Sequence, residues 1–241
     1  MKSKIFGEIL EQTPEHVKDY VDKASDKMVI IKSLEEGIRQ DQLIQNILDL
    51  HNKGNPIDLD LTYSKGVFYK SGLVQQPTYK VDLNEVGEGI INCDFMDTPF
   101  ENESIKSIMF DPPFVISGKT ADQSKDGSCV ITKRFTAYHS WQELKDSYKG
   151  ALTESYRILE DNGIMIVKCQ NQISSGKQHF SHYYVLKTCL ELGFYPLDEF
   201  VVMSKSKMTS FGGRWKTQQH AMKMHSYFLV FKKRKAKVNY D

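Results

Sequence analysis

Four consecutive residues, Asp111, Pro112, Pro113 and Phe114, carry the clearest chemical signal in the chain. They directly follow the apolar run 108–110, so we expect the acid to emerge just past the end of a buried strand. The two prolines remove two backbone donors and leave rigid carbonyl oxygens that can only accept hydrogen bonds. A carboxylate and such a carbonyl suit an exocyclic amine on a nucleic-acid base, since both accept from NH₂ and can draw its nitrogen toward tetrahedral geometry. The aromatic ring can stack on a base that has left the helix, whereas the simpler alternative is a strand-to-loop turn with a helix-capping acid.

Acidic residues also follow the first three strands that the sequence predicts. Asp60 ends the first strand before a short polar turn, and Asp82 lies 22 residues later at the end of the next strand. An acid at about that interval is suited to hold the hydroxyls of a ribose. Asp94 lies just past the third strand. Each acid alone is typical of a turn, but the three together favour a cofactor site.

Alternating strand and helix patterns predict an α/β fold, with a mostly parallel sheet and helices on both faces. Ligands of such sheets bind at the carboxyl ends of the strands, where the acidic residues above fall. The capping-box spacing of Ser140 and Glu143 predicts a helix start, and Gly193 predicts a helix end. Helices are expected over 14–25, 34–51, 140–159 and 180–192, and strands over 57–61, 79–83, 89–93, 107–110, 163–168, 200–203 and 226–232.

We expect three parts along the chain. A helical extension over residues 1–53 packs on a core domain over residues 54–233, and a basic tail follows at 234–241. The core domain carries long loops at 115–139 and 204–223, and loops of this length are more often functional than merely connecting.

The motif at 111–114 resembles the catalytic motif of the amino-methylating DNA methyltransferases, which has the form (Asp/Asn/Ser)-Pro-Pro-(Tyr/Phe/Trp). Asp with Phe is most similar to the adenine-N6 enzymes in which the cofactor motif precedes the catalytic one. The segments 97–108, 151–168 and 220–233 resemble corresponding parts of class I methyltransferases. The resemblance implies a Rossmann-like class I methyltransferase fold, S-adenosyl-L-methionine as cofactor, and site-specific methylation of the N6 amine of adenine in DNA after base flipping. It requires neither a metal nor a covalent intermediate.

The resemblance also places the cofactor residues. Members of the family usually carry a glycine-rich loop of FxGxG type after the first strand, whereas this chain has a single glycine there, Gly66. Asp94 corresponds to the acid that accepts from the adenine amine of the cofactor. The residues expected to bind the cofactor are Asp60, Thr62, Tyr63, Ser64, Gly66, Asp82, Asp94 and Phe95.

Basic residues gather toward the C-terminal end of the chain. From Met203 onward there are ten Lys or Arg and one acid, whereas the preceding residues hold 22 basic and 30 acidic ones. A basic end on an acidic body favours a surface that contacts phosphates, with a solvated tail as the alternative. Basic side chains hold phosphates, and an aromatic one can stack on a base. The residues expected to contact DNA are Lys133, Arg134, Arg214, Trp215 and Lys216.

Composition limits the remaining possibilities. Four scattered cysteines without a CxxC pair argue for a reducing compartment and against a disulfide framework or zinc knuckle. The first twenty residues lack the apolar core of a signal peptide, and no apolar run approaches the roughly 20 residues of a membrane span, so we expect a cytoplasmic protein. No cysteine follows a proline, which excludes covalent cytosine-C5 chemistry. The histidines at 179, 182, 220 and 225 lack the partners of a metal site.

Other functions remain open at this point. A tRNA or rRNA base-amino methyltransferase would use the same motif, with RNA in place of DNA. A catalytically inactive methyltransferase fold that binds nucleic acid is favoured by the degenerate glycine loop and disfavoured by the intact Asp111. A protein-glutamine methyltransferase fits less well, because its motif usually starts with Asn. The absence of an obvious target-recognition domain favours short specificity, as in a solitary or phage-encoded enzyme.

Overall fold

The computed structural model describes residues 30–83, 87–116, 138–204, 217 and 219–234. The chain divides into two compact units between Lys32 and Ser33. The larger unit therefore includes helix α3 (Gln40–His51), whereas the sequence placed the boundary of the extension after residue 53. The helix predicted over 14–25 lies outside the described residues.

A seven-stranded sheet forms the centre of the larger unit, in the order β3-β2-β1-β4-β5-β9-β8. The first five strands of that order are parallel, and β9 runs antiparallel to both of its neighbours. This order and the mostly parallel pairing confirm the predicted class I methyltransferase fold. The strands are β1 (Leu59–Asp60), β2 (Tyr79–Asp82), β3 (Ile90–Asn92), β4 (Ile105–Phe110), β5 (Leu159–Cys169), β8 (Phe194–Met203) and β9 (His225–Lys233).

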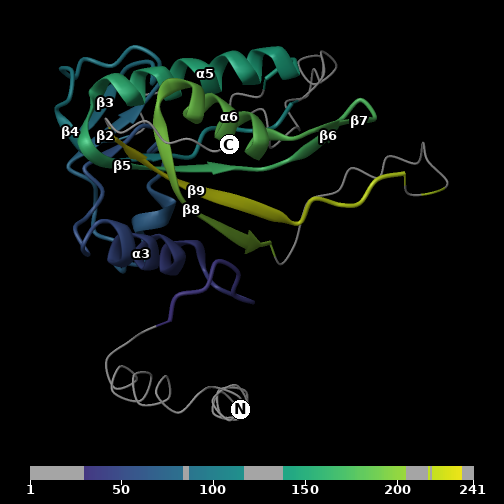
Figure 1. The fold of residues 1–241 in the computed structure, drawn as a ribbon, viewed down its shortest axis with the longest axis horizontal. Coiled ribbons are helices and arrows are strands. Elements are labelled where there is room, and N and C mark those ends of the chain that lie inside the picture. Colours follow the sequence, from purple (N-terminus) through teal and green to yellow (C-terminus); the bar gives the residue numbers. More distant parts are fainter. Residues whose placement is uncertain (1–29, 84–86, 117–137, 205–216, 218, 235–241) are drawn as a thin grey trace, which may run out of the picture. The chain divides into compact units, whose positions relative to one another are not determined.

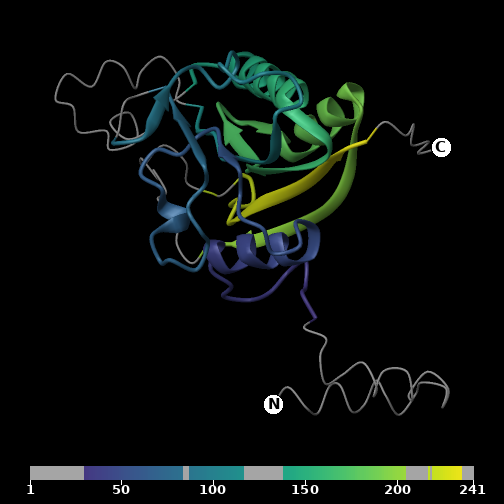
Figure 2. The ribbon, with the colours of Figure 1, turned by 90° about the vertical axis from the view of Figure 1, so that its left-hand side faces the viewer.

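Helices cover both faces of this sheet (Figures 1 and 2). Helices α5 (Trp141–Ile158) and α6 (Ser181–Leu192) lie over one face, and α3 lies on the opposite side, where His51 contacts Asp198 of β8. A short 3-10 helix, η1 (Val67–Tyr69), packs against α3. The core consists of apolar side chains of the central strands together with the buried face of α5, such as Leu144, Ala151 and Leu152.

The predicted ends of α5 and α6 are confirmed. The Ser140 side chain accepts from the backbone N–H of Glu143, whose own carboxylate accepts from the N–H of His139 at 2.8 Å. These contacts satisfy donors that the first turn of a helix leaves without partners. Helix α6 ends at Gly193, whose φ of 98° lies in the left-handed region that glycine adopts without strain.

The helix predicted over 34–51 is wrong in its first third. Helix α3 begins at Gln40, because Gly37 has a φ of 75° that interrupts helical geometry. Leu34 instead forms an isolated bridge with Val201 of β8 and is 53% exposed. Leu34 is spaced from the apolar residues of α3 as a helix would require, but it does not lie on that helix.

Strand β5 contains the turn that the sequence predicts at 161–163. Ile105 pairs with Leu159 and Ser107 pairs with Ile164, so the two strands shift register across this short stretch. Asn162 has a φ of 66°, which places the turn residue in the left-handed region that Asn tolerates. Beyond β5 the chain forms a hairpin that we did not predict, β6 (Gln172–Ser174) and β7 (Lys177–His179).

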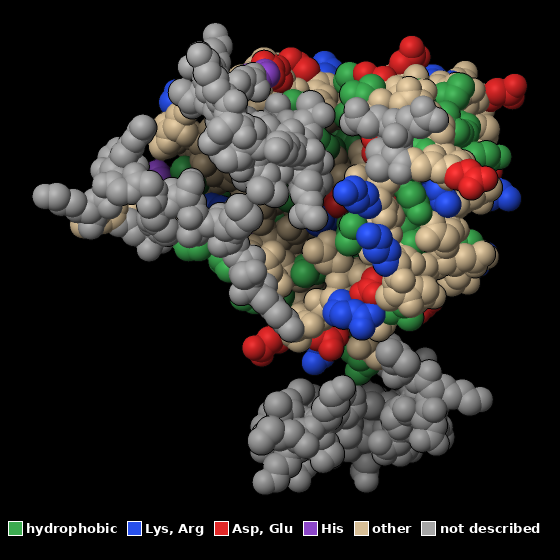
Figure 3. All heavy atoms as spheres, turned by 180° about the vertical axis from the view of Figure 1, so that it is seen from behind, with side chains coloured by type: hydrophobic (Ala, Val, Ile, Leu, Met, Phe, Trp, Pro, Cys, Tyr) green, Lys and Arg blue, Asp and Glu red, His purple; other side chains and the backbone are tan. Residues whose placement is uncertain are grey.

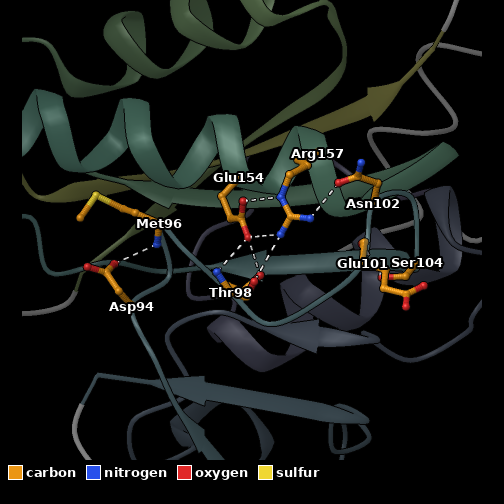
Figure 4. A network of polar contacts seen from close by, with 8 residues as sticks. All are labelled: Asp94, Met96, Thr98, Glu101, Asn102, Ser104, Glu154 and Arg157. Atoms are coloured by element: carbon orange, nitrogen blue, oxygen red, sulfur yellow. Dashed lines mark hydrogen bonds and ion pairs between the residues drawn. The ribbon is translucent and has the colours of Figure 1, made fainter.

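A polar network fixes the segment between β3 and β4 against α5 (Figure 4). The Glu154 carboxylate accepts from both the N–H and the hydroxyl of Thr98, at 2.9 and 2.6 Å. Arg157 donates to both oxygens of Glu154 and also to Asn102. Glu154 is 6% exposed, so its charge is satisfied almost entirely by these partners. The network thereby holds the segment that begins with Asp94 and Phe95.

The described surface carries charges of both signs. On the face shown in Figure 3, Lys and Arg side chains lie among acidic and apolar ones. Among the described residues, no helix has both the length and the apolar character needed to cross a membrane.

Candidate active site

The Asp111 motif lies at the carboxyl end of β4, at the centre of the sheet. Strand β4 is flanked by β1 and β5, and the backbone N–H of Asp111 donates to Thr62 Oγ1 at 2.8 Å. Thr62 belongs to the turn after β1, so this bond joins the predicted cofactor turn to the predicted catalytic motif. Pro112 is buried, and Asp111, Pro113 and Phe114 are partly exposed. Within the described part of the chain, no donor reaches the carbonyl oxygens of Pro112 or Pro113.

The strongest partner of Asp111 is a residue that sequence reasoning missed, Lys168 on β5. Its ammonium lies 2.8 Å from Asp111 Oδ2. Phe110 pairs with Val167 in the parallel register of β4 and β5. The next residues on the two strands, Asp111 and Lys168, therefore lie side by side. A single lysine in the otherwise apolar run 163–169 was the available signal. The bond leaves Oδ1 of Asp111 without a described donor, on a side chain that is 20% exposed.

Aromatic rings surround the Lys168 ammonium. The centroids of the rings of Phe68, Phe114 and Phe228 lie 5.2, 5.9 and 6.0 Å from Nζ. These distances are within the range of cation–π attraction. Phe228 is the register partner of Lys168 on β9, and Phe68 lies on η1. Four segments of the chain thus meet at this ammonium group: β5, which carries it, the Asp111 motif, η1 and β9. Lys168 as a whole is 8% exposed.

Asp60 is buried at the end of β1 and is held entirely by the protein. Oδ1 accepts from the N–H of Thr62 at 2.9 Å, and Oδ2 accepts from the hydroxyl of Tyr69 at 2.7 Å. Burial raises the pKa of Asp60 to about 7, against the hydrogen bonds from Tyr69 and Thr62, and the nearby charges of Asp111 and Asp82 raise it further. Asp60 therefore shapes the turn after β1.

The raised pKa of Asp60 predicts a pH-dependent stability. The folded state holds a proton between about pH 4 and pH 7 that the unfolded state has lost, because the pKa rises from 3.8 to about 7 on folding. The free energy of unfolding should therefore fall across this interval, by on the order of 2–4 kcal/mol, and level off above it. Asp60→Asn keeps a carbonyl acceptor for Thr62 and cannot titrate, so it should lose this slope. Urea unfolding of both proteins between pH 4.5 and 8.5 measures the difference, and parallel curves would contradict the assignment.

The turn after β1 is compact and is tied to β2. Ser64 has a φ of 48°, and its N–H donates to Asp82 Oδ2 at 2.9 Å. Gly66 has a φ of 58°, and a Cβ there would meet the Tyr63 ring, with Cζ at 2.6 Å. Tyr63 stacks on Tyr69 with centroids 5.6 Å apart. Glycine is favoured at this position because it adopts this backbone angle without strain and because a side chain would displace the Tyr63 ring.

Asp94 and Phe95 follow β3 at the same edge of the sheet. Asp94 is half-buried, and its Oδ1 accepts from the N–H of Met96 at 2.8 Å. The Phe95 ring packs edge-to-face on Phe110 of β4, with centroids 5.3 Å apart. The structure thus brings the predicted cofactor residues to the carboxyl ends of β1, β2 and β3, where Thr62 binds Asp111 and Phe95 packs on Phe110.

The residues predicted to contact DNA, Lys133, Arg134, Arg214, Trp215 and Lys216, lie outside the described residues. Of the histidines considered for a metal, His182 contacts the Asn171 side chain at 2.9 Å and stacks on Tyr227. The described residues contain no group of three or more His, Cys, Asp or Glu side chains that could hold a metal ion.

Several solved structures are similar to this chain at low identity. A putative DNA modification methylase from Thermus thermophilus, solved with S-adenosyl-L-methionine, is 14% identical with a TM-score of 0.39, over 59% of this chain and 53% of that one. The cytosine-N4-specific PvuII DNA methyltransferase is 18% identical with a TM-score of 0.40, over 56% and 44%. A putative sarcosine dimethylglycine methyltransferase from Galdieria sulphuraria is 12% identical with a TM-score of 0.49, over 92% and 99%. The chain spans about half the length of the first two proteins, and no curated protein matches it.

A family model gives the stronger result. The model described as DNA methylase matches residues 105–241, from the first residue of β4 onward. The match includes the Asp111 motif and Lys168, and it leaves out the turn after β1. Because it covers more than half of the chain, the chain belongs to the DNA methylase family that groups N6 and N4 enzymes.

Proposed function

We propose that this protein transfers a methyl group from S-adenosyl-L-methionine to the N6 amine of adenine in DNA, after the base has flipped out of the helix. The observation that carries the proposal is the state of Asp111 at the end of β4. One carboxylate oxygen is fixed by Lys168, and the other has no described donor, on a side chain that is 20% exposed.

The target amine would meet acceptors only. Asp111 Oδ1 and the carbonyl oxygen of Pro112 or Pro113 would each accept one of its hydrogens, and these bonds favour a tetrahedral nitrogen with a localised lone pair. Phe114 would stack on the flipped base. The backbone bond from Asp111 to Thr62 fixes the motif to the turn after β1, which supports close placement of the amine and the cofactor.

The side chains at the edge of the sheet fit the proposed cofactor. Asp82 and Asp94 are half-buried carboxylates after neighbouring strands, suited to ribose hydroxyls and to an adenine amine. Asp60 would act through the turn that it holds, together with Thr62, Tyr63, Ser64 and Gly66, and Phe95 would line the site beside Asp94. When bound, the cofactor supplies an electrophilic methyl group. The turn departs from the usual glycine-rich loop, and its one glycine, Gly66, has a left-handed backbone.

Adenine is favoured over cytosine by the resemblance of the Asp-Pro-Pro-Phe motif to the adenine-N6 enzymes. The family itself includes both chemistries, and the PvuII structure is that of a cytosine-N4 enzyme. DNA is favoured over RNA by the family description. Lys133, Arg134, Arg214, Trp215 and Lys216 are the proposed contacts to the nucleic acid, because they are basic or aromatic residues of loops that follow strands of the same sheet.

The test is transfer of labelled methyl from S-adenosyl-L-methionine to duplex DNA and, in parallel, to total RNA, followed by nucleoside analysis. We expect N6-methyladenine in DNA, and label reduced by about 10²- to 10³-fold with Asp111→Asn. N4-methylcytosine would overturn the choice of base, and label in RNA alone would overturn the choice of substrate. Absence of label with the cofactor still bound would favour a protein that binds nucleic acid without methylating it.

A further inference from the structure

We propose that Lys168 is a positioning residue for methyl transfer, which holds the Asp111 carboxylate so that one oxygen faces the target amine. The inference rests on the proposed function, because the acceptor role of Asp111 is part of it. It goes further in assigning a role to a strand residue outside the Asp-Pro-Pro-Phe motif.

The surroundings of Lys168 leave its ammonium one anionic partner. The residue is 8% exposed, and lysine is almost never buried unless it is paired. Asp111 is the anion that it contacts among the described residues, at 2.8 Å. The rings of Phe68 and Phe228 lie around Nζ and contribute attraction without competing hydrogen-bond acceptors of comparable strength. The position of the ammonium is therefore set by β5 and its neighbours, independently of the substrate.

Asp111 gains its orientation from this fixed ammonium. A free carboxylate on a loop can rotate about two side-chain bonds, whereas one oxygen of Asp111 is bound by Lys168 and its backbone N–H by Thr62. The two contacts come from opposite neighbours of β4, so they fix the residue from both sides. The second oxygen is then the one available to accept from an amine.

Lys168 also reaches the proposed stacking ring. The centroid of the Phe114 ring lies 5.9 Å from Lys168 Nζ, the same atom that binds Asp111. One ammonium thus contacts both the acceptor and the aromatic residue of the motif. Removal of the ammonium should disturb the alignment of the flipped base more than the affinity for DNA. This difference separates a positioning role from a binding role.

The experiment uses the full-length protein with Lys168→Met, Lys168→Arg and, as the matched control, Lys106→Met, which removes an exposed lysine of β4. Rates are normalised to the fraction of protein that binds S-adenosyl-L-methionine, so that misfolded molecules do not count. We expect Lys168→Met to lower kcat about 10- to 100-fold, with the KM for DNA and the Kd for the cofactor changed less than about threefold. Lys168→Arg should recover part of kcat, and Lys106→Met should match the wild type.

A double-mutant cycle tests whether Lys168 acts through Asp111. In an Asp111→Asn background, Lys168→Met should cause little further loss, because the carboxylate that it orients is absent. A full additional loss would overturn the positioning role, as would a kcat of Lys168→Met within threefold of the wild type. Absence of transfer by the wild-type protein would instead overturn the proposed function, and this role with it.

Discussion

Asp111→Asn is expected to reduce methyl transfer by about 10²- to 10³-fold while leaving binding of S-adenosyl-L-methionine intact. The substitution replaces one of two carboxylate oxygens by an NH₂ group, which donates where the target amine needs an acceptor. Loss of one preorganised hydrogen-bonding group at a reacting centre typically costs this much in kcat. Cofactor binding is retained because the predicted cofactor side chains after β2 and β3 are unchanged.

Single-turnover methylation of DNA and equilibrium binding of the cofactor measure the two effects separately. The matched control is Asp146→Asn, which makes the same chemical change on an exposed position of α5. Retention of more than a tenth of the wild-type rate by Asp111→Asn would contradict the assignment of Asp111 as the acceptor for the amine.

Glu154→Ala is expected to lower the free energy of unfolding by about 3 kcal/mol. The change removes a buried carboxylate and leaves the N–H and hydroxyl of Thr98 without their acceptor. Truncating one partner of a buried ion pair commonly costs 3–5 kcal/mol, and the partial exposure of Arg157 places this case near the lower end. Although burial opposes it, hydrogen bonds from Arg157 and Thr98 hold the pKa of Glu154 below its usual range. The contribution is therefore present at neutral pH and is lost as the pH falls through that lowered pKa.

Urea unfolding at neutral pH measures the loss, and the pair of variants Arg157→Met and Glu154→Ala/Arg157→Met completes a cycle. The double variant should lose less than the sum of the single ones, because the two side chains interact directly. A loss below about 1 kcal/mol for Glu154→Ala would show that Thr98 and the following segment do not depend on the carboxylate.

The sequence predicted most of the elements that carry a local signal. The strand before Asp111, the capping box at Ser140 and the helix end at Gly193 depend on residues within a few positions of one another. The start of α3 was mispredicted because Gly37 overrides the apolar spacing of the residues before it. The hairpin of β6 and β7 has a turn pair, Ser175-Gly176, but it lacks the alternating apolar residues of a half-buried strand, so its polar sequence did not indicate strands.

The candidate site was predictable residue by residue but not as a set of contacts. The position of Asp111 follows from one strand and its two prolines, whereas its bond to Lys168 depends on the register of β4 against β5. Those residues are separated by 57 positions, and one sequence gives no signal for such a register. Asp60 was predicted to bind the cofactor, but its hydrogen bond to Tyr69 depends on the fold of η1, which lacks a recognisable pattern.

The place of β9 within the sheet has a consequence for synthesis of the chain. Residues 225–233 are the last of the sheet to leave the ribosome, yet they lie between β5 and β8 and bury residues such as Phe228 and Phe231. Until they arrive, β5 has an open edge and β8 has no hydrogen-bonded neighbour in the sheet. Unpaired strand edges of nascent chains are sites of association with other chains. The protein is therefore most vulnerable to aggregation late in translation, and its sheet closes only when the strand beside Lys168 is added.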